Sequence, residues 1–303
     1  MDGLISVITT TFDREDALDA VLRGLSGQSD RDFEVVIADD GSGPTTAALV
    51  ADWTRRLGVP LRHVRQEHRG FRAAEMRNRA IRASCGAYCI FLDGDCIPRS
   101  DFIAAHRRLA EPSWFVAGNR ILLSRRLTET VLRDRMAVER LGLGTFVRWR
   151  LRGDVNRLMP IAHIPLGAVR KARAASWIGC RSCNLAIWRS DLDRVDGFDS
   201  AYTGWGKEDS DLVVRLLRAG VRRKDGRFAT GVLHLWHPPA DRSALPRNET
   251  RLGEVVAGAD VRAAWGLSRL DDVRAPAEIG AGPAPAAGPW PAAGVPASAG
   301  SSR

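Results

Sequence analysis

An alternation of strand-like and helix-like segments fills the first 120 residues, and it constrains the fold more than any other feature. Short apolar segments are typical of buried strands, and three occur here: LISVITT, FEVVIAD and AYCIFLD. PLRHVRQ is predicted as a fourth strand. Segments with helical spacing of apolar residues follow them: EDALDAVLRGL, TTAALVADWTRRLG, AAEMRNRAIRAS and SDFIAAHRRLA. Since a helix is the usual connection between parallel strands, the sequence predicts an α/β fold with helices on both faces of a mainly parallel, twisted sheet.

Aspartates follow two of these predicted strands. Asp39 and Asp40 end one strand, and Asp93 and Asp95 follow another. Open α/β sheets bind ligands at the carboxyl ends of their strands, and residues two apart in an extended chain point the same way. Two carboxylates beside Gly94 could therefore hold Mg²⁺ or Mn²⁺ and leave positions for phosphate oxygens. A turn with helix-capping aspartates explains the same spacing.

Two histidines, His234 and His237, stand at the end of a late predicted strand in the segment VLHLWHPP. An imidazole at this position could bind the same metal ion from a second direction. A structural role for either histidine is the alternative interpretation.

The segment TGWGKEDSDL places three acids at the start of a predicted helix: Glu208, Asp209 and Asp211. Acids in a first turn complement the helix dipole, which is a sufficient structural explanation for them. This explanation does not account for Trp205, which stands between two glycines, the second of which is Gly206. An aromatic ring there suits a platform for a sugar or a base, and a neighbouring carboxylate could accept a proton from a hydroxyl group. The residues alone leave both interpretations open.

The net charge of +9 is concentrated in one segment, because residues 120–173 hold thirteen Lys or Arg and only four Asp or Glu. Such a patch could face a membrane surface, a polyanion or a nucleic acid, and a solvated arginine-rich helical face is the plain alternative. Within the segment, apolar and basic residues are interleaved: Phe146, Val147, Trp149 and Leu151 with Arg148, Arg150 and Arg152. This pattern suits either contact with a membrane or packing into the core.

Several absent features narrow the class of protein further. The chain has no run of about 18 uncharged apolar residues, and MDGLISVITT lacks the basic region and cleavage site of a secretory signal. We therefore expect a cytoplasmic protein. The five cysteines are scattered, so we expect no disulfide framework. The single CxxC at Cys180 and Cys183 has no second pair at zinc spacing, so we do not expect a metal or redox role for it. No G-x-G-x-x-G follows the first strand, which argues against a dinucleotide fold of the hydride-transfer type.

Several segments together resemble a known enzyme family. ISVITTTFDRED, FEVVIADDGSG, GFRAAEMRNRAI and CIFLDGDCIPRSDF resemble the nucleotide-sugar half of family 2 glycosyltransferases, which have the GT-A fold. GFDSAYTGWGKEDSDLVVRLLRAG resembles the C-terminal module shared with β-1,4-galactosyltransferases and bacterial chondroitin-type polymerases. The resemblance covers roughly residues 3–240, and its most specific part is a D-x-D motif followed by GWGxEDxDL and a strand-end histidine.

The resemblance implies a role for each matching residue. Asp209 matches the general base, and Glu208 matches an acid that orients the acceptor. Trp205 and Gly206 match the acceptor platform. The positions that match contacts to the nucleotide-sugar are Thr10, Phe12, Asp13, Asp39, Asp40, Arg77, Asp93 and Gly94. The positions that match ligands of Mn²⁺ or Mg²⁺ are Asp93, Asp95, His234 and, as a second choice, His237.

The resemblance also implies a domain plan. We expect one GT-A domain over residues 1–240, with a nucleotide-sugar half at 1–120, a basic helical insert at 121–175 and an acceptor half at 176–240. A helical extension at 241–272 would follow. An Ala/Pro/Gly-rich tail at 273–303 is expected to be disordered.

The implied function is metal-dependent, inverting transfer of a sugar from a UDP-sugar to a hydroxyl group of a glycan or lipid-linked glycan acceptor. We expect it to serve bacterial cell-surface polysaccharide synthesis, in the cytoplasm or at the inner face of an anionic membrane. Nucleic acid is not an expected partner. The alternative hypothesis is a non-catalytic protein that binds polyanions through residues 120–173.

Overall fold

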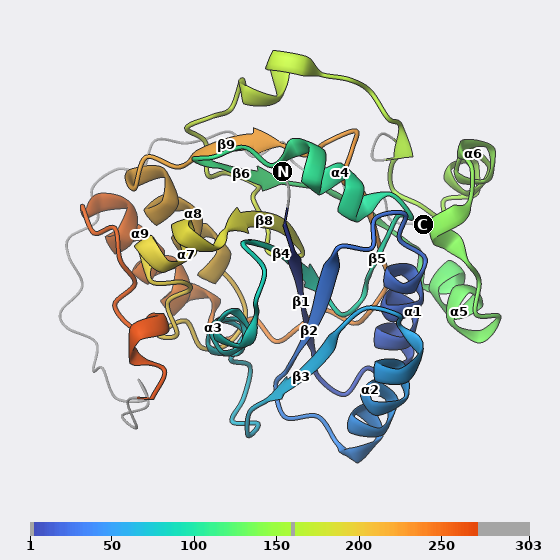
Figure 1. Cartoon of the computed structure of the whole chain (residues 1–303), viewed down its shortest axis with the longest axis horizontal. Coiled ribbons are helices and arrows are strands. Elements are labelled where there is room, and N and C mark those ends of the chain that lie inside the picture. Colours follow the sequence, from blue (N-terminus) through green and yellow to red (C-terminus); the bar gives the residue numbers. More distant parts are fainter. Residues whose placement is uncertain (1–2, 159–160, 272–303) are drawn as a thin grey trace. The chain divides into compact units, whose positions relative to one another are not determined.

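The predicted alternation is present in the computed structural model of the chain, which describes residues 3–158 and 161–271 (Figure 1). Four neighbouring strands pair in parallel in the order β3-β2-β1-β4. Their bounds are β1 (Ile5–Thr11), β2 (Phe33–Asp39), β3 (Leu61–Arg65) and β4 (Tyr88–Asp93). The connecting helices are α1 (Glu15–Ser26), α2 (Pro44–Arg56) and α3 (Ala73–Ala83).

Three later strands extend this sheet to seven strands within the described residues, in the order β3-β2-β1-β4-β8-β6-β9. They are β6 (Trp114–Ala117), β8 (Asn184–Trp188) and β9 (Arg222–Asp225). Strand β8 runs antiparallel to β4 and β6, whereas β6 and β9 are parallel to each other. The prediction of a mainly parallel sheet is confirmed.

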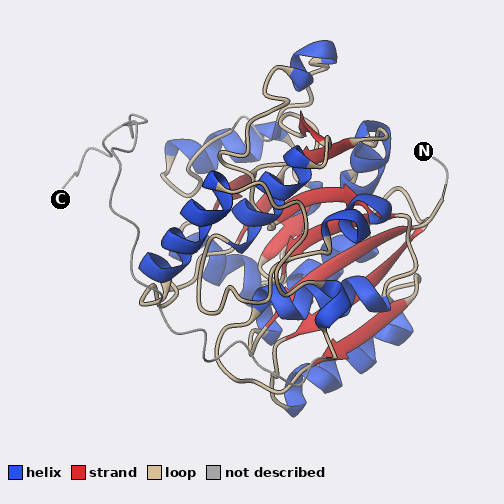
Figure 2. Ribbon diagram, turned by 90° about the vertical axis from the view of Figure 1, so that its left-hand side faces the viewer, coloured by secondary structure: helices blue, strands red, loops and turns tan. Residues whose placement is uncertain are grey.

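Helices cover both faces of this sheet, as Figure 2 shows. One core lies beneath α1, α2 and α4 (Phe102–Leu109); the other lies beneath α3, α7 (Arg189–Val195) and α8 (Glu208–Arg218). Successive side chains of a strand point to opposite faces, so Val7 of β1 belongs to the first core and Ile8 to the second. This double burial explains why β1, β2 and β4 appear in the sequence as continuous apolar segments.

Three short strands form a small second sheet. It has the order β5-β10-β7, with bounds β5 (Cys96–Pro98), β7 (Arg120–Leu122) and β10 (Val232–His234). Strand β10 is antiparallel to β5, and the register pairs His234 with Cys96. This pairing brings the chain around residue 234 back to the segment that follows β4.

The basic insert is less helical than the sequence analysis predicts. Among its described residues, 121–158 and 161–175, are α5 (Arg125–Arg133), α6 (Leu143–Leu151) and the 3-10 turns Val138–Arg140 and Gly167–Lys171. Much of the remainder is turn and loop, and Gly153, with a φ of 75°, follows the end of α6. No helix among the described residues combines the length and apolar character needed to cross a bilayer.

The predicted C-terminal extension contains α9 (Leu245–Ala257) and a 3-10 turn, Leu267–Arg269. Helix α9 contacts α8, so this extension packs on the domain that carries the sheet. The tail at 273–303 lies outside the described residues.

Candidate active site

The carboxyl ends of β1 and β4 form the floor of the site. Their register pairs Thr10 with Asp93, and Thr10 Oγ1 donates to Asp93 Oδ1 at 3.3 Å. The next residue is Gly94, where a Cβ atom would lie 2.4 Å from the carbonyl oxygen of Thr10. Glycine is therefore the residue that lets the D-x-D turn pass this close to β1.

Asp95 lies between two imidazoles. Its Oδ2 is 3.3 Å from His237 Nε2, and its Oδ1 is 3.7 Å from His234 Nε2. Burial lowers the pKa of His234, against the pull of the Asp95 charge, and so favours the neutral ring that can bind a metal. A carboxylate and two imidazoles, half-buried together, fit Mn²⁺. The structure thus brings three of the four predicted ligands together, whereas the fourth, Asp93, is bonded to Thr10 and Arg77.

Two cysteines join this cluster, which the sequence analysis missed. Single ligand atoms of Asp93, Cys96 and Cys183 lie within 4.8 Å of one another, as do those of Asp95, Cys96 and His234. Both thiols are buried, and burial raises the pKa of Cys96 well above its ordinary range. The CxxC spacing gave no sign of this, because its other member, Cys180, belongs to the opposite core.

The guanidinium of Arg77 joins the two halves of the site. The side chain comes from α3 and is buried; its Nη2 donates to Asp93 Oδ1 at 3.2 Å and its Nη1 to Glu208 Oε1 at 3.0 Å. Burial opposes this charge, but Asp93, Glu208 and Asp209 outweigh it and raise the pKa of Arg77. The guanidinium therefore stays charged and holds both carboxylates in place.

Glu208 and Asp209 are the first two residues of α8; Glu208 is buried and Asp209 is half-buried. Burial raises the pKa of both carboxyl groups; the charge of Asp209 raises that of Glu208 further, and Arg77 opposes both shifts. Asp209 Oδ2 accepts a bond from the Ser182 amide at 3.4 Å. Glu208 Oε2 has no hydrogen-bond partner among the described residues, so this buried oxygen is free to accept from a ligand.

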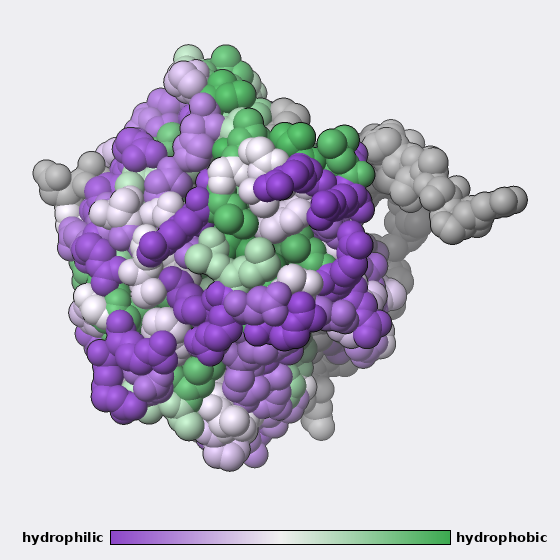
Figure 3. All heavy atoms as spheres, turned by 90° about the vertical axis from the view of Figure 1, so that its right-hand side faces the viewer, coloured by the Kyte–Doolittle hydropathy of each residue, from purple (hydrophilic) through white to green (hydrophobic). Residues whose placement is uncertain are grey.

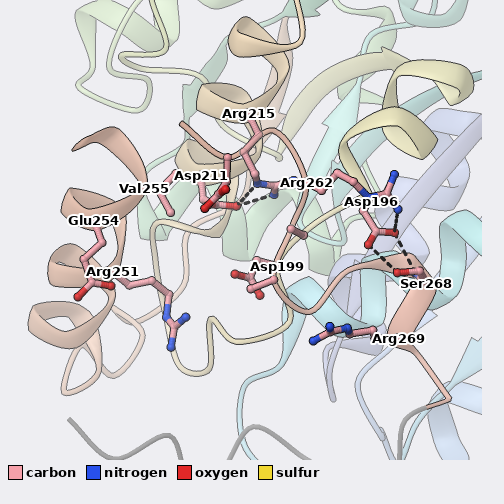
Figure 4. Close-up of a pocket in the computed structure, with 13 residues that line it drawn as sticks. Asp196, Asp199, Asp211, Arg215, Arg251, Glu254, Val255, Arg262, Ser268 and Arg269 are labelled. Carbon is pink, nitrogen blue, oxygen red and sulfur yellow. Dashed lines mark hydrogen bonds and ion pairs between the residues drawn. The ribbon is translucent and has the colours of Figure 1, made fainter. Parts of the chain in front are cut away.

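The third acid of this segment has a structural role. Asp211 forms a buried ion pair with Arg215, whose Nε lies 2.9 Å from Asp211 Oδ2. Figure 4 shows both residues at a cavity of about 590 Å³, which Asp199, Arg251 and Arg262 also line. None of the predicted site residues lines that cavity.

Trp205 stands between Gly204 and Gly206, which both have positive φ angles, 74° and 104°. Arg242 lies over the indole ring, 4.8 Å from its centroid, so a guanidinium already covers one ring face. An open cavity of about 500 Å³ lies beside this loop, and Arg69 and Gly204 are among the residues that line it. Trp205 is thus half-buried beside an open cavity and in contact with Arg242, and its role as an acceptor platform stays a prediction.

The acids predicted for nucleotide contact, Asp39 and Asp40, bond to their own loop and to residues of neighbouring segments. Asp39 is fully buried, accepts from the amides of Gly41 and Ser42 at 3.1 and 2.8 Å, and lies 2.8 Å from His63 Nε2. Burial raises the pKa of Asp39, but these donors outweigh it and hold the pKa below its ordinary value. Asp40 accepts from the amide of Arg72 at 3.0 Å.

Two further predicted nucleotide contacts lie at the same edge. Phe12 is 42% exposed and stacks on His68, with ring centroids 4.0 Å apart. Asp13, which has a φ of 44°, accepts from the Gly43 amide at 2.8 Å. The histidines at 63 and 68 were missed by the sequence analysis, because neither belongs to a recognisable motif.

Carboxylates and imidazoles thus gather after the carboxyl ends of β1 and β4, and Arg77 connects them to the acids at the start of α8. Residues 6–164 match the family described as glycosyl transferase family 2, and residues 169–237 match the N-terminal domain of galactosyltransferase. The chain belongs to glycosyltransferase family 2.

Curated relatives agree with this assignment. Validoxylamine A glucosyltransferase of Streptomyces hygroscopicus subsp. limoneus is 30% identical over 249 residues, which are 76% of this chain and 51% of the relative. Chondroitin synthase of Escherichia coli is 25% identical over 250 residues, 76% of this chain and 34% of the relative. The chain thus spans about half the length, or less, of these relatives.

Solved structures share the fold. The mannosyltransferase PcManGT of Pyrobaculum calidifontis, in complex with GDP-Man and Mn²⁺, has a TM-score of 0.58 and 20% identity over 85% of this chain and 64% of its own. Residues 1–349 of S. aureus TarS, in complex with UDP, have a TM-score of 0.57 and 16% identity over 88% and 68%. The predicted GT-A fold is confirmed.

Proposed function

We propose that the protein transfers a sugar from a UDP-sugar to a hydroxyl group of a glycan or lipid-linked glycan, with inversion at the anomeric carbon and dependence on Mn²⁺ or Mg²⁺. The observation that carries this proposal is the link through Arg77, which ties the D-x-D aspartate Asp93 to Glu208 at the start of α8. The structural relatives with UDP, GDP-Man and Mn²⁺ support a nucleotide-sugar donor and a divalent ion.

Asp95 and His234, with His237 beside them, would hold the ion. When bound, such an ion offsets the negative charge that develops on the leaving diphosphate. The chain itself contributes the placement: Thr10 and Arg77 fix Asp93, and Gly94 keeps the turn against β1. These contacts preorganise the donor side before substrate binds.

Asp209 is the proposed base. It accepts the proton of the acceptor hydroxyl as that oxygen attacks the anomeric carbon and the bond to UDP breaks, in one displacement that inverts the carbon. Burial strengthens this carboxylate as a base by raising its pKa. Glu208 presents the unpartnered Oε2, which suits a hydrogen bond from an acceptor hydroxyl.

Trp205 is the proposed acceptor platform, and the chondroitin synthase relative supports a glycan acceptor. We further propose a role in bacterial cell-surface polysaccharide synthesis at the cytoplasmic face of the membrane. Membership of an enzyme family argues against the non-catalytic polyanion-binding alternative.

A donor panel tests the proposal. Purified full-length protein is incubated with several UDP-sugars and with GDP-mannose, and nucleotide release is measured with Mn²⁺, with EDTA, and with Mn²⁺ restored. We expect release from one or a few UDP-sugars, loss with EDTA and recovery with Mn²⁺. Nucleotide release that EDTA does not change would refute the metal dependence. Release only from GDP-mannose would refute the assignment of a UDP-sugar as donor.

A further inference from the structure

Helix α6 of the basic insert leaves an apolar row uncovered. Its inner side is anchored by Phe146 and Trp149, which are buried and pack edge to face with ring centroids 5.1 Å apart. On the outer side, Leu143, Val147 and Leu151 are 53%, 37% and 83% exposed. Residues four apart lie along one face of a helix, so these three form a continuous row. The interleaved pattern in the sequence thus serves both purposes, core packing on one side and a free surface on the other.

Arginines border this row on both sides. Arg148 and Arg152 lie along the next row of the helix, and Arg150 lies across the stripe from them. All three are exposed, and none forms an ion pair with a carboxylate among residues 3–158 and 161–271. Figure 3 faces the side that carries α5 and α6 and shows apolar residues gathered in its upper half, with hydrophilic residues beside and below them.

The positive charge beside the apolar row of α6 distinguishes between two kinds of partner, a second copy of the chain and an anionic bilayer. A second copy of the chain, packed face to face across a two-fold axis, would bring these unpaired guanidinium groups toward their own counterparts. An anionic bilayer instead offers phosphate groups for the arginines and an apolar boundary for the leucines. The surplus of basic residues over residues 120–173 extends the same attraction beyond α6.

We propose that the outer face of α6 is a docking site for a bilayer that contains anionic lipid. Leu143, Val147 and Leu151 enter the boundary between headgroups and acyl chains, while the flanking arginines bind lipid phosphates. Leu122 of the adjoining β7 is in register with His234 of β10, which places the proposed metal ligands next to the insert. If the proposed function also holds, this docking brings the site to acceptors that are linked to membrane lipid.

Vesicle co-sedimentation tests the docking with the full chain. Vesicles of phosphatidylcholine alone are compared with vesicles that also contain phosphatidylglycerol, at low and high salt. We expect binding to the anionic vesicles, about tenfold weaker binding to neutral ones, and a loss of binding as salt rises. Equal binding to both kinds of vesicle, or none to either, would overturn the proposal.

Matched variants locate the surface. The triple change Leu143→Gln, Val147→Gln, Leu151→Gln and the triple change of Arg148, Arg150 and Arg152 to Gln should each reduce binding about tenfold. Val169→Gln, at an apolar residue of the insert that is 66% exposed but outside α6, should bind as wild type does. Wild-type binding by either triple variant would contradict the proposal.

Two further readouts complete the test. Sedimentation velocity of the soluble protein would reveal a dimer that the leucine variant abolishes, and such a dimer would assign the face to a second copy and overturn the proposal. UDP-sugar hydrolysis should be the same in the α6 variants as in wild type. Because hydrolysis and vesicle binding are measured separately, failure of the proposed enzyme activity would be distinguishable from failure of the docking.

Discussion

Arg77 places one positive charge among three carboxylates, and this explains how a buried Glu208 can lie next to a half-buried Asp209 at the start of α8. Asp93, Glu208 and Asp209 all act on its charge, and it donates to the first two. Burial raises the pKa of Glu208 and of Asp209, and a single guanidinium shared among three carboxylates offsets only part of that rise. An enzyme that needs a base stronger than an ordinary aspartate benefits from this imbalance.

Asp209→Asn separates binding from chemistry. An amide cannot take the hydroxyl proton, so we expect turnover to fall by roughly 10²–10⁴-fold while UDP-sugar binding stays close to that of wild type. Steady-state transfer or hydrolysis and calorimetric binding measure the two quantities. Full turnover by this variant would remove Asp209 from the mechanism; Asp241→Asn, at an exposed aspartate, is the matched control.

The same variant should be more stable than wild type at neutral pH. Burial raises the pKa of Asp209 in the folded state, so the stability this group contributes is present at low pH and is lost as pH rises through the raised value. Asparagine does not ionise, so the Asp209→Asn variant does not lose this stability as the pH rises. We expect a higher Tm for Asp209→Asn than for wild type at pH 7 and a smaller difference at pH 4; a lower Tm at pH 7 would contradict the argument.

The pH profile gives an independent check on Arg77. Asp209 is a base only when ionised, so kcat/KM should rise with pH through its raised pKa. Arg77 opposes that rise in pKa, so Arg77→Gln should move the acid limb of the profile to higher pH, besides lowering activity. An acid limb that stays in place or moves to lower pH would show that the titrating group is not the one beside Arg77.

At the scale of elements, α8 carries both chemistry and structure on successive turns. Its first residues face the site, and its next turn is held by the Asp211–Arg215 pair, in which Arg215 Nη1 also donates to the carbonyl oxygens of Val195 and Gly197 at 2.7 and 2.9 Å. These bonds tie α8 to the end of α7, and so they fix where Glu208 and Asp209 point.

Breaking that anchor should be costly. Arg215→Met would leave the carboxylate of Asp211 buried without its partner, and we expect a loss of about 3–5 kcal/mol in the free energy of unfolding. Adding Asp211→Leu should recover part of this loss. Urea unfolding measures both variants, and a change below about 1 kcal/mol for Arg215→Met would show that the pair is not the anchor.

Sequence patterns predicted some elements and not others, for identifiable reasons. Strands β1, β2 and β4 are buried on both faces and so appear as apolar runs, and the start of α8 is marked by its acids. Strand β9 has the sequence RRKD, which no apolar pattern can reveal; its Arg223 is buried because it donates to the carbonyl oxygen of Ile178 at 2.8 Å. The three-residue strands of the small sheet are too short to show periodicity.

At the scale of the whole molecule, the site depends on contacts between segments that lie far apart in the chain. The D-x-D pair and the acids of α8 were predictable because each belongs to a local motif. The arrival of Cys183 beside Cys96, and of Arg242 over Trp205, was not, since neither pairing leaves a trace in spacing. The positive charge of the basic insert was evident from the sequence. Which of its apolar residues stay exposed was not, because that depends on packing.

Calorimetric titration with UDP tests whether Asp95, with His234, holds a divalent ion that binds the donor diphosphate. We expect wild type to bind UDP about tenfold or more tightly with Mn²⁺ than with EDTA, and Asp95→Ala to lose that difference, while Asp52→Ala on the exposed side of α2 keeps it. If Asp95→Ala and wild type bound UDP with the same affinity in Mn²⁺, Asp95 would not be a ligand of the ion that binds the diphosphate.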